Sequence, residues 1–136
     1  MGHQQLLITL LTVCVIGVLV SVGVIALQDA LAPDNRAELT RSLQALGKEA
    51  QLYCRRPFVE GGGEGTFLGL SATIHGIRKL TPKNSTLHGD LFIRKNGTLR
   101  SVELIAVGVE PGRDPRYPIR IAMTVWADST ALMTLN

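Results

Sequence analysis

The chain has 136 residues, enough for one modest domain, and its 14 basic and 11 acidic residues give a net charge of +3. A charge this small and scattered does not indicate a nucleic-acid-binding surface. Aromatic residues make up 4% of the chain, so the stacking platforms that bind bases are lacking as well. Nucleic acid is therefore not expected as a partner.

The N-terminal part of the chain carries no charged residue before Asp29. Residues 6–27 read LLITLLTVCVIGVLVSVGVIAL, which as a helix is about 33 Å long, enough to cross a bilayer core of about 30 Å. A buried helix of a soluble protein this small would not be apolar on every face. We therefore predict a hydrophobic helix over residues 1–28.

A cleaved signal peptide is the alternative for this segment. Its apolar region is normally about 7–15 residues long and follows a basic stretch, but residues 1–5 contain no Lys or Arg. Ala30-Leu31-Ala32 resembles a cleavage site, yet Pro33 would follow the scissile bond, where its ring and missing N–H suit a peptidase poorly. The pattern favours a helix that is retained.

A second, amphipathic helix is predicted over residues 29–56, continuing the first. Its apolar positions recur at spacings of four, three, four and three, which is one stripe of an α-helix: Leu39, Leu43, Leu46, Ala50 and Tyr53. Asn35 and Glu38 have the spacing of a capping box, and Pro33 fits either a helix start or a kink in a continuous helix. Arg55-Arg56-Pro57 ends the helix.

Residues 57–66 are predicted to be a flexible linker, because residues 61–65 read GGGEG. The alternative, a phosphate-binding loop, needs a preceding strand, a following helix and a Lys-Ser/Thr pair. Here a helix precedes the glycines and no Lys is near.

An antiparallel β domain is predicted over residues 67–136, where apolar residues alternate with polar ones. Residues 66–77 read as one strand or two short ones. Asn96-Gly97 lies between two apolar runs and predicts a hairpin with a type I′ turn. Residues 110–118 form a proline-rich loop, and residues 130–135 form a short terminal strand.

The fold class predicted from these elements is α+β: a long N-terminal helix, apolar and then amphipathic, packed on a small antiparallel sheet of four or five strands. We expect the helix stripe to face one side of the strand over residues 119–125, with Arg120 and Thr124 on the other side. The predicted helix–sheet core is Leu39, Leu43, Leu46, Ala50, Tyr53, Ile119, Ile121, Met123 and Val125.

This order of elements resembles the type IV pilins and pseudopilins. It is also similar to a group of pilin-like proteins that begin with Gly and glutamines and carry a tyrosine-arginine-proline segment and a glycine run after the helix. The corresponding stretches here are Gln4-Gln5-Leu6-Leu7, Tyr53-Cys54-Arg55-Arg56-Pro57 and residues 61–65. The resemblance implies a prepilin processed by a prepilin peptidase, handled by assembly machinery, and polymerised through its helices.

The N-terminus departs from the pilin pattern. Type IV pilins carry a basic leader and a glutamate at the fifth position of the mature chain, whereas Gln5 is neutral and no acid lies near. If cleavage follows Gly2, His3 becomes the first residue. In either case alignment would rest on hydrogen bonds from His3, Gln4 and Gln5 rather than on an ion pair.

Small residues in the apolar helix favour close packing of several copies, since they let backbones approach. Gly17 and Ser21 are spaced by four, with Gly23 nearby, and the alternative is glycine merely tolerated in a membrane helix. The predicted assembly residues are Gln4, Gln5, Leu6, Leu10, Cys14, Gly17, Val18, Ser21 and Gly23.

No residues are predicted to be catalytic, to bind a cofactor or to bind a metal. Cys14 and Cys54 would lie about 60 Å apart on a continuous helix, too far for a disulfide, and Cys54 is expected to be a free or buried thiol. His75 and His88 show no metal-ligand spacing with it. Asn84 and Asn96 fit the N-glycosylation sequence.

Two functions remain open at this point. The first is a structural subunit of an extracellular type IV pilin-like filament: a homo-oligomer of many copies, held in the inner (cytoplasmic) membrane before assembly and displayed on the cell surface afterwards. The second is a membrane-anchored module that does not polymerise, either a minor pilin or pseudopilin or a single-pass binding domain. Neither is an enzyme.

Overall fold

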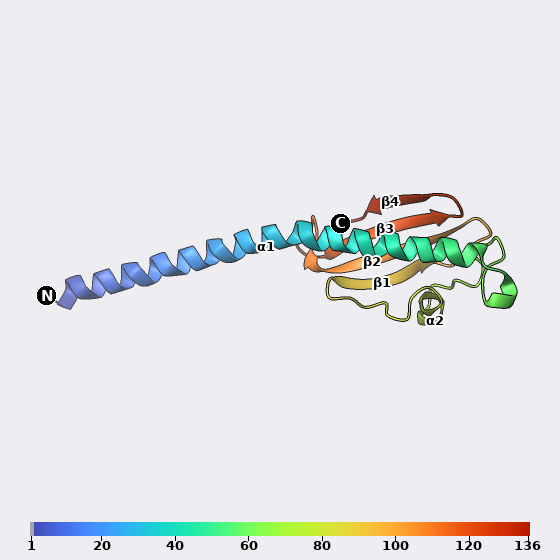
Figure 1. Cartoon of the computed structure of the whole chain (residues 1–136). Helices are drawn as coiled ribbons and strands as arrows, with labels where there is room; N and C mark the ends of the chain where they lie inside the picture. Colours follow the sequence, from blue (N-terminus) through green and yellow to red (C-terminus); the bar gives the residue numbers. More distant parts are fainter. Residues whose placement is uncertain (1) are drawn as a thin grey trace.

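The computed structural model describes residues 2–136, and for residues 28–33 it describes the backbone but not the side chains. Helix α1 (Gly2–Arg55) is followed by a short 3₁₀ turn (Phe58–Glu60) and helix α2 (Ile74–Arg78). Four strands come next: β1 (Gly89–Lys95), β2 (Ser101–Pro111), β3 (Pro118–Trp126) and β4 (Thr130–Thr134). In Figure 1 the sheet lies along the C-terminal half of α1, and the N-terminal half projects from the domain by itself.

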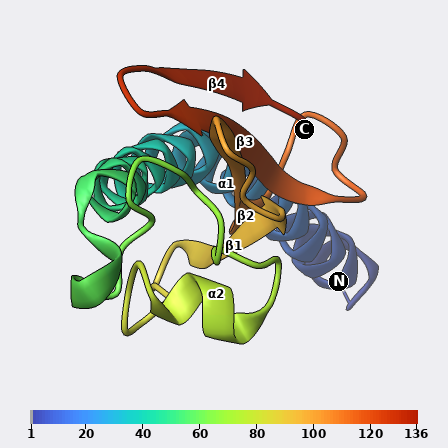
Figure 2. The same cartoon turned by 90° about the vertical axis from the view of Figure 1, so that its right-hand side faces the viewer.

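The sheet is an antiparallel meander with the strand order β1-β2-β3-β4. In its central row, Leu104 of β2 pairs with Ile93 of β1 and with Met123 of β3. Viewed from the end, α2 lies beside β1, and β4 forms the opposite edge (Figure 2). The predicted α+β class is confirmed, with four strands.

The helix and the sheet share one continuous apolar core. Paired residues of an antiparallel sheet lie on the same face, so β2 and β3 present their buried side chains together to α1. Arg120 is exposed and Thr124 half-buried on the opposite face. All nine residues predicted for this core are at most 5% exposed: Leu39, Leu43, Leu46, Ala50, Tyr53, Ile119, Ile121, Met123 and Val125.

Two glycines allow α1 to lie close to the sheet. A Cβ atom on Gly47 of α1 would collide with the Met123 side chain and lie 3.5 Å from Val125 Cγ2. On the other side of the interface, a Cβ atom on Gly108 of β2 would lie 2.8 Å from Leu39 Cδ1. Side-chain size at these two positions therefore limits how closely the two layers approach.

We predict that Gly47→Leu destabilises the domain by about 1–3 kcal/mol, because extra methylenes in a filled core force neighbouring side chains out of their rotamers. The measurement is the free energy of unfolding of the full chain in detergent micelles. Ala45→Leu is the matched control, since Ala45 is exposed on the same helix. Equal stability of the two variants would contradict the close approach at Gly47.

The strand predicted within residues 66–77 is wrong. Gly69 has φ of +92°, which interrupts an extended segment, and Thr73 begins α2 by accepting a hydrogen bond from the Gly76 N–H. This irregular segment nevertheless supplies buried apolar side chains at the end of the core: Phe67, Leu70, Ile77 and Leu80.

The type I′ turn predicted at Asn96-Gly97 is also wrong, because tertiary contacts override the local turn preference. β1 and β2 are joined by residues 96–100, and Gly97 does not have the positive φ that a type I′ turn requires. Its N–H donates to Leu70 O (2.7 Å), and Asn96 Oδ1 accepts from the Ala72 N–H (2.7 Å). The loop is thus fastened to residues 67–72.

The capping box predicted at Asn35 and Glu38 is wrong as well, since α1 continues without a new start. Asn35 lies within α1 and is buried. Its Nδ2 donates to His88 O (2.9 Å), which links α1 to the turn before β1. Glu38 pairs with Arg41 at 2.9 Å instead. The side chain of Pro33, the residue proposed as a start or a kink, lies outside the described residues.

A charged cluster lies where β1 has a bulge between Ile93 and Lys95. Glu103 of β2 accepts from Arg94 Nη1 (2.6 Å) and lies 3.1 Å from Lys95 Nζ. Burial by itself favours the protonated carboxyl, but the hydrogen bonds and charges of Lys95 and Arg94 outweigh it and lower the pKa of Glu103. The ionised carboxylate therefore stabilises the folded state.

We predict that Glu103→Gln lowers the free energy of unfolding by about 0.5–1 kcal/mol at pH 7, the range expected for a pair with exposed cations. A lowered pKa makes this stabilisation full above the unfolded pKa of about 4.3, and it is lost as the pH falls through the folded value. Denaturant unfolding at pH 7 and at pH 3 measures it. If the free energy of unfolding of Glu103→Gln stays below that of the unmodified chain by the same amount down to pH 3, this account is contradicted.

Candidate assembly surface

The N-terminal half of α1 is an exposed apolar surface. Gly2–Leu27 has a mean hydropathy of 2.9 over its most apolar window, and none of that window is buried against the rest of the chain. Leu6, Val18 and Leu27 are between 61% and 65% exposed. By length and composition this segment is a membrane anchor or a signal sequence.

Most of the predicted assembly residues lie on one side of this helix. With about 100° of rotation per residue, positions spaced by four and by seven fall within about a third of the circumference. That side contains Leu6, Leu10, Cys14, Gly17, Val18 and Ser21. Gln4 borders it, and Gln5 and Gly23 fall on the opposite side. The small residues Cys14, Gly17 and Ser21 thus share a face, and Gly23 does not.

The hydroxyl groups of the apolar helix are satisfied by its own backbone. Thr9 Oγ1 donates to Gln5 O, Thr12 Oγ1 to Ile8 O, and Ser21 Oγ to Gly17 O, at 2.8–2.9 Å. An unsatisfied hydroxyl in an apolar environment costs about 1–3 kcal/mol on protein mutational scales. This helix can therefore be surrounded by lipid or by other apolar helices without that cost.

The first turn of α1 contains no acidic residue. Gln4 and Gln5 are both exposed there, so their amides are available to groups outside the chain. An amide offers two N–H donors and an acceptor oxygen without a charge.

At the opposite end of α1, the glycine-rich segment caps the helix. The N–H groups of Gly63, Glu64 and Gly65 donate to the carbonyls of Tyr53, Arg56 and Cys54, at 2.8, 3.0 and 2.6 Å. Gly61 and Gly65 have φ of +79° and +88°. These amides are turned inward, which removes the donors that a phosphate-binding loop would need. The segment is a hydrogen-bonded cap rather than the flexible linker predicted.

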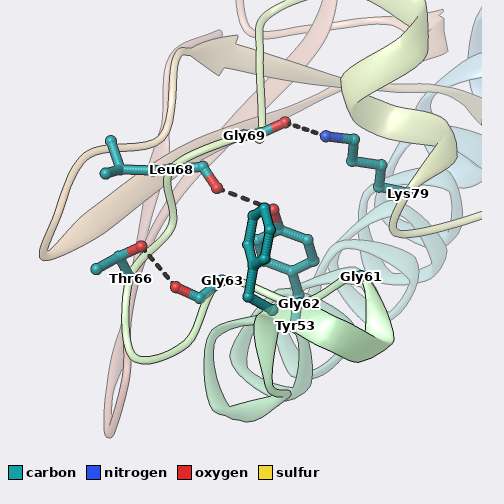
Figure 3. Close-up of a pocket in the computed structure, with 9 residues that line it drawn as sticks. Tyr53, Gly61, Gly62, Gly63, Thr66, Leu68, Gly69 and Lys79 are labelled. Carbon is teal, nitrogen blue, oxygen red and sulfur yellow. Dashed lines mark hydrogen bonds between the residues drawn. The ribbon is translucent and has the colours of Figure 1, made fainter.

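A hollow of about 630 Å³ lies beside this cap, formed by Tyr53, Phe58, residues 61–63, Thr66, Leu68, Gly69 and Lys79. Figure 3 shows Tyr53 and Lys79 held by the backbone of the same short segment. The Tyr53 hydroxyl donates to Leu68 O (2.8 Å) and Lys79 Nζ to Gly69 O (2.8 Å). Burial raises the pKa of Tyr53, so its hydroxyl stays protonated and continues to donate.

The remaining candidate groups lie apart from one another. Cys14 is exposed and Cys54 is buried, and both are free thiols. Burial raises the pKa of Cys54, and the Arg55 charge opposes this only in part. His75 and His88 are exposed, and residues 2–136 contain no group of three or more His, Cys, Asp or Glu side chains arranged to hold a metal ion.

The two asparagines of the glycosylation sequences differ in accessibility. Asn84 is half-buried and its Nδ2 donates to Leu91 O (3.4 Å). Asn96 is exposed, and its Oδ1 accepts from the Ala72 N–H. Of the two side chains, Asn96 is the one that solvent reaches more freely.

Comparisons of the chain with protein-family models, with curated proteins and with solved structures found no match. The long apolar N-terminal helix followed by a four-stranded antiparallel sheet is a plausible pilin-like architecture.

Sequence reasoning missed two features that shape this molecule, the close approach at Gly47 and Gly108 and the cap at residues 61–65. A glycine between Leu46 and Ala50, inside the apolar stripe, was a usable signal for the first. For the second, the glycine run after the helix was only a general signal, because the local sequence does not set the pairing of its N–H groups with the carbonyls of Tyr53, Cys54 and Arg56.

Proposed function

We propose that this protein is a structural subunit of an extracellular, type IV pilin-like filament and that it polymerises through the apolar half of α1. The observation that carries this proposal is the continuity of α1, in which one helix provides both the exposed apolar segment and the buried stripe of the domain. Because no joint separates them, packing of the apolar segments fixes the positions of the domains around them.

The apolar half of α1 needs an apolar environment around it. About 33 Å of apolar helix (residues 6–27) cannot remain in water, and in lipid it has little reason to associate unless small residues allow close backbone contact. Outside the membrane, other copies of the same helix are a sufficient cover. The shared face of Cys14, Gly17 and Ser21 supports such packing, and the internal hydrogen bonds of the hydroxyl groups make it compatible with a dry bundle.

The membrane holds the subunit before assembly in this proposal, and a prepilin peptidase and assembly machinery act on it if the resemblance to pilins extends to processing. Alignment between copies rests on neutral contacts of Gln4 and Gln5. A neutral amide costs less to desolvate than a glutamate, which would need a positive partner in the bundle.

The second candidate function is a membrane-anchored module that does not polymerise, such as a minor pilin, a pseudopilin or an anchored binding domain. The hollow beside Tyr53 and Lys79 favours it, since the segment after α1 that contributes to its lining lies at the end of the domain farthest from the apolar segment (Figure 1). Material sheared from the cell surface distinguishes the two functions, because only a major filament subunit is expected to dominate it.

We predict that Val18→Asp abolishes or strongly reduces filament formation. It places a charge on the packing face, at a cost of about 2.5–3.5 kcal/mol on membrane-insertion scales. Filament yield in the sheared fraction, checked by electron microscopy, is the measurement, with the amount of subunit in the membrane recorded in parallel. Val18→Ile is the control because it keeps the face apolar. Normal filament yield from Val18→Asp would refute polymerisation through this face.

We predict that Gln5→Glu does not improve assembly and makes filament stability more sensitive to pH. A glutamate titrates near pH 4.3, whereas Gln5 does not titrate. Filament dissociation is compared at pH 3 and pH 5.5 for both chains; the two chains differ only at position 5, so the difference between them reports that position. If Gln5→Glu assembles distinctly better, the neutral alignment proposed here is wrong.

A further inference from the structure

The outer edge of β4 is an open strand edge. All five residues of Thr130–Thr134 are exposed. Two backbone hydrogen bonds, from Trp126 N to Ser129 O (2.8 Å) and from Leu135 N to Arg120 O (2.9 Å), fix the alternation of the ladder between β3 and β4. The N–H and C=O groups of Thr130, Leu132 and Thr134 therefore point away from β3. Within residues 2–136, no hydrogen bond reaches these groups from the outer side.

The opposite edge of the sheet, on β1, is closed. The Leu91 N–H donates to Asn84 O (2.8 Å) and the Thr86 N–H donates to Gly89 O (2.8 Å), so the segment before β1 occupies outward groups of Gly89 and Leu91. The bulge between Ile93 and Lys95, with its charged side chains, interrupts the rest of this edge. Coverage, bulges and charges are the usual ways in which proteins prevent strand addition.

β4 has none of these protective features. Residues 130–135 read TALMTL, without a charge, a proline or a glycine, and the pairing with β3 has no bulge. Leu132, Met133 and Leu135 are 45%, 61% and 40% exposed. A flat, uncharged edge with these side chains accepts another strand readily.

We propose that the β4 edge binds the β4 edge of a second copy of this chain, in an antiparallel pair about a two-fold axis at Leu132. Strand addition requires a partner strand whose own edge is open. Among the described strands of this protein β1 is closed, and β2 and β3 lie inside the sheet, so a second copy can offer only β4. The contact uses the same surface on both copies.

The sequence of β4 is self-complementary in this register. Leu132 lies opposite Leu132 of the second copy, Thr130 opposite Thr134, and Ala131 opposite Met133. The outward-facing residues form the hydrogen-bonded pairs, each exchanging two hydrogen bonds. Asp128 falls opposite Asn136, so no like-charged side chains meet. The two sheets become one continuous antiparallel sheet with both α1 helices on the same face.

The direction of the strands relative to α1 determines which copies can form this pair. The strands run roughly along α1 (Figure 1), so an antiparallel β4 pair sets the two α1 helices in opposite directions. Two copies in one membrane, or in one filament whose helices all point the same way, cannot adopt this arrangement. The pair therefore joins neighbouring filaments of opposite direction. Only this consequence rests on the proposed function, and the pairing itself does not.

Disulfide formation in the full chain in detergent micelles tests the register. Chains that carry Cys14→Ala, to remove the exposed native thiol, receive Ala131→Cys or Met133→Cys. Positions 131 and 133 of the two copies form a pair with Cα atoms about 4.5 Å apart, within disulfide range. We expect a disulfide-linked dimer after mild oxidation when the two chains are mixed, and several-fold less from either alone. No dimer in the mixture, or equal dimer from each single chain, overturns the pairing.

Electron microscopy of surface filaments tests the consequence. Leu132→Lys places two like charges opposite each other at the two-fold axis, and Leu132→Ile is the matched control. We expect wild-type and Leu132→Ile filaments to lie in bundles, and Leu132→Lys to give single filaments in unchanged yield. Bundles that persist in Leu132→Lys, or that are missing from wild type, overturn the inter-filament role. Absence of filaments from all three chains contradicts the proposed function instead, and the micelle experiment still decides the pairing.

Discussion

The constraint on which the molecule depends is that one unbroken helix serves two environments. Toward its C-terminus, α1 buries a single stripe against the sheet and leaves its other faces to water. Toward its N-terminus it is apolar all round and the domain covers none of it. Burial of apolar area dominates the free energy of both halves. The C-terminal half therefore packs on the sheet and folds the domain, whereas the N-terminal half requires lipid or other copies. One continuous helix thereby connects the domain to the exposed apolar segment.

The interface between α1 and the sheet combines large apolar side chains with glycine at the points of closest approach. Gly47 and Gly108 stand on opposite sides of this interface, where neighbouring side chains occupy the space that a Cβ atom would need. Hydrogen bonds link the helix to the domain at both ends of this interface. Asn35 bonds His88 where α1 first contacts the domain, and Tyr53 bonds Leu68 near the C-terminus of α1. Packing supplies most of the stabilisation, and these polar links define the position of the sheet along the helix.

The two edges of the sheet differ in whether they can accept another strand. β1 is closed by the segment that precedes it and by a charged bulge, whereas β4 presents free backbone groups and uncharged side chains. Edges of the second kind favour association, and soluble proteins usually block them. In the filament proposed above such an edge has a use, provided that its geometry prevents pairing within the membrane.

The sequence by itself determined the elements whose pattern is strong and local. The charge-free segment, the stripe from Leu39 to Tyr53 and the alternation from Ile119 to Val125 predicted the long helix, its buried face and the orientation of β3, because periodicity reports which side of an element leaves water. Only the tertiary structure decided residues 66–77 and the Asn96-Gly97 loop, which bind each other across the end of the sheet. It also decided the cap at residues 61–65 and the open edge of β4. Local preferences there differ by about 1 kcal/mol or less, and hydrogen bonds to segments distant in sequence outweigh them.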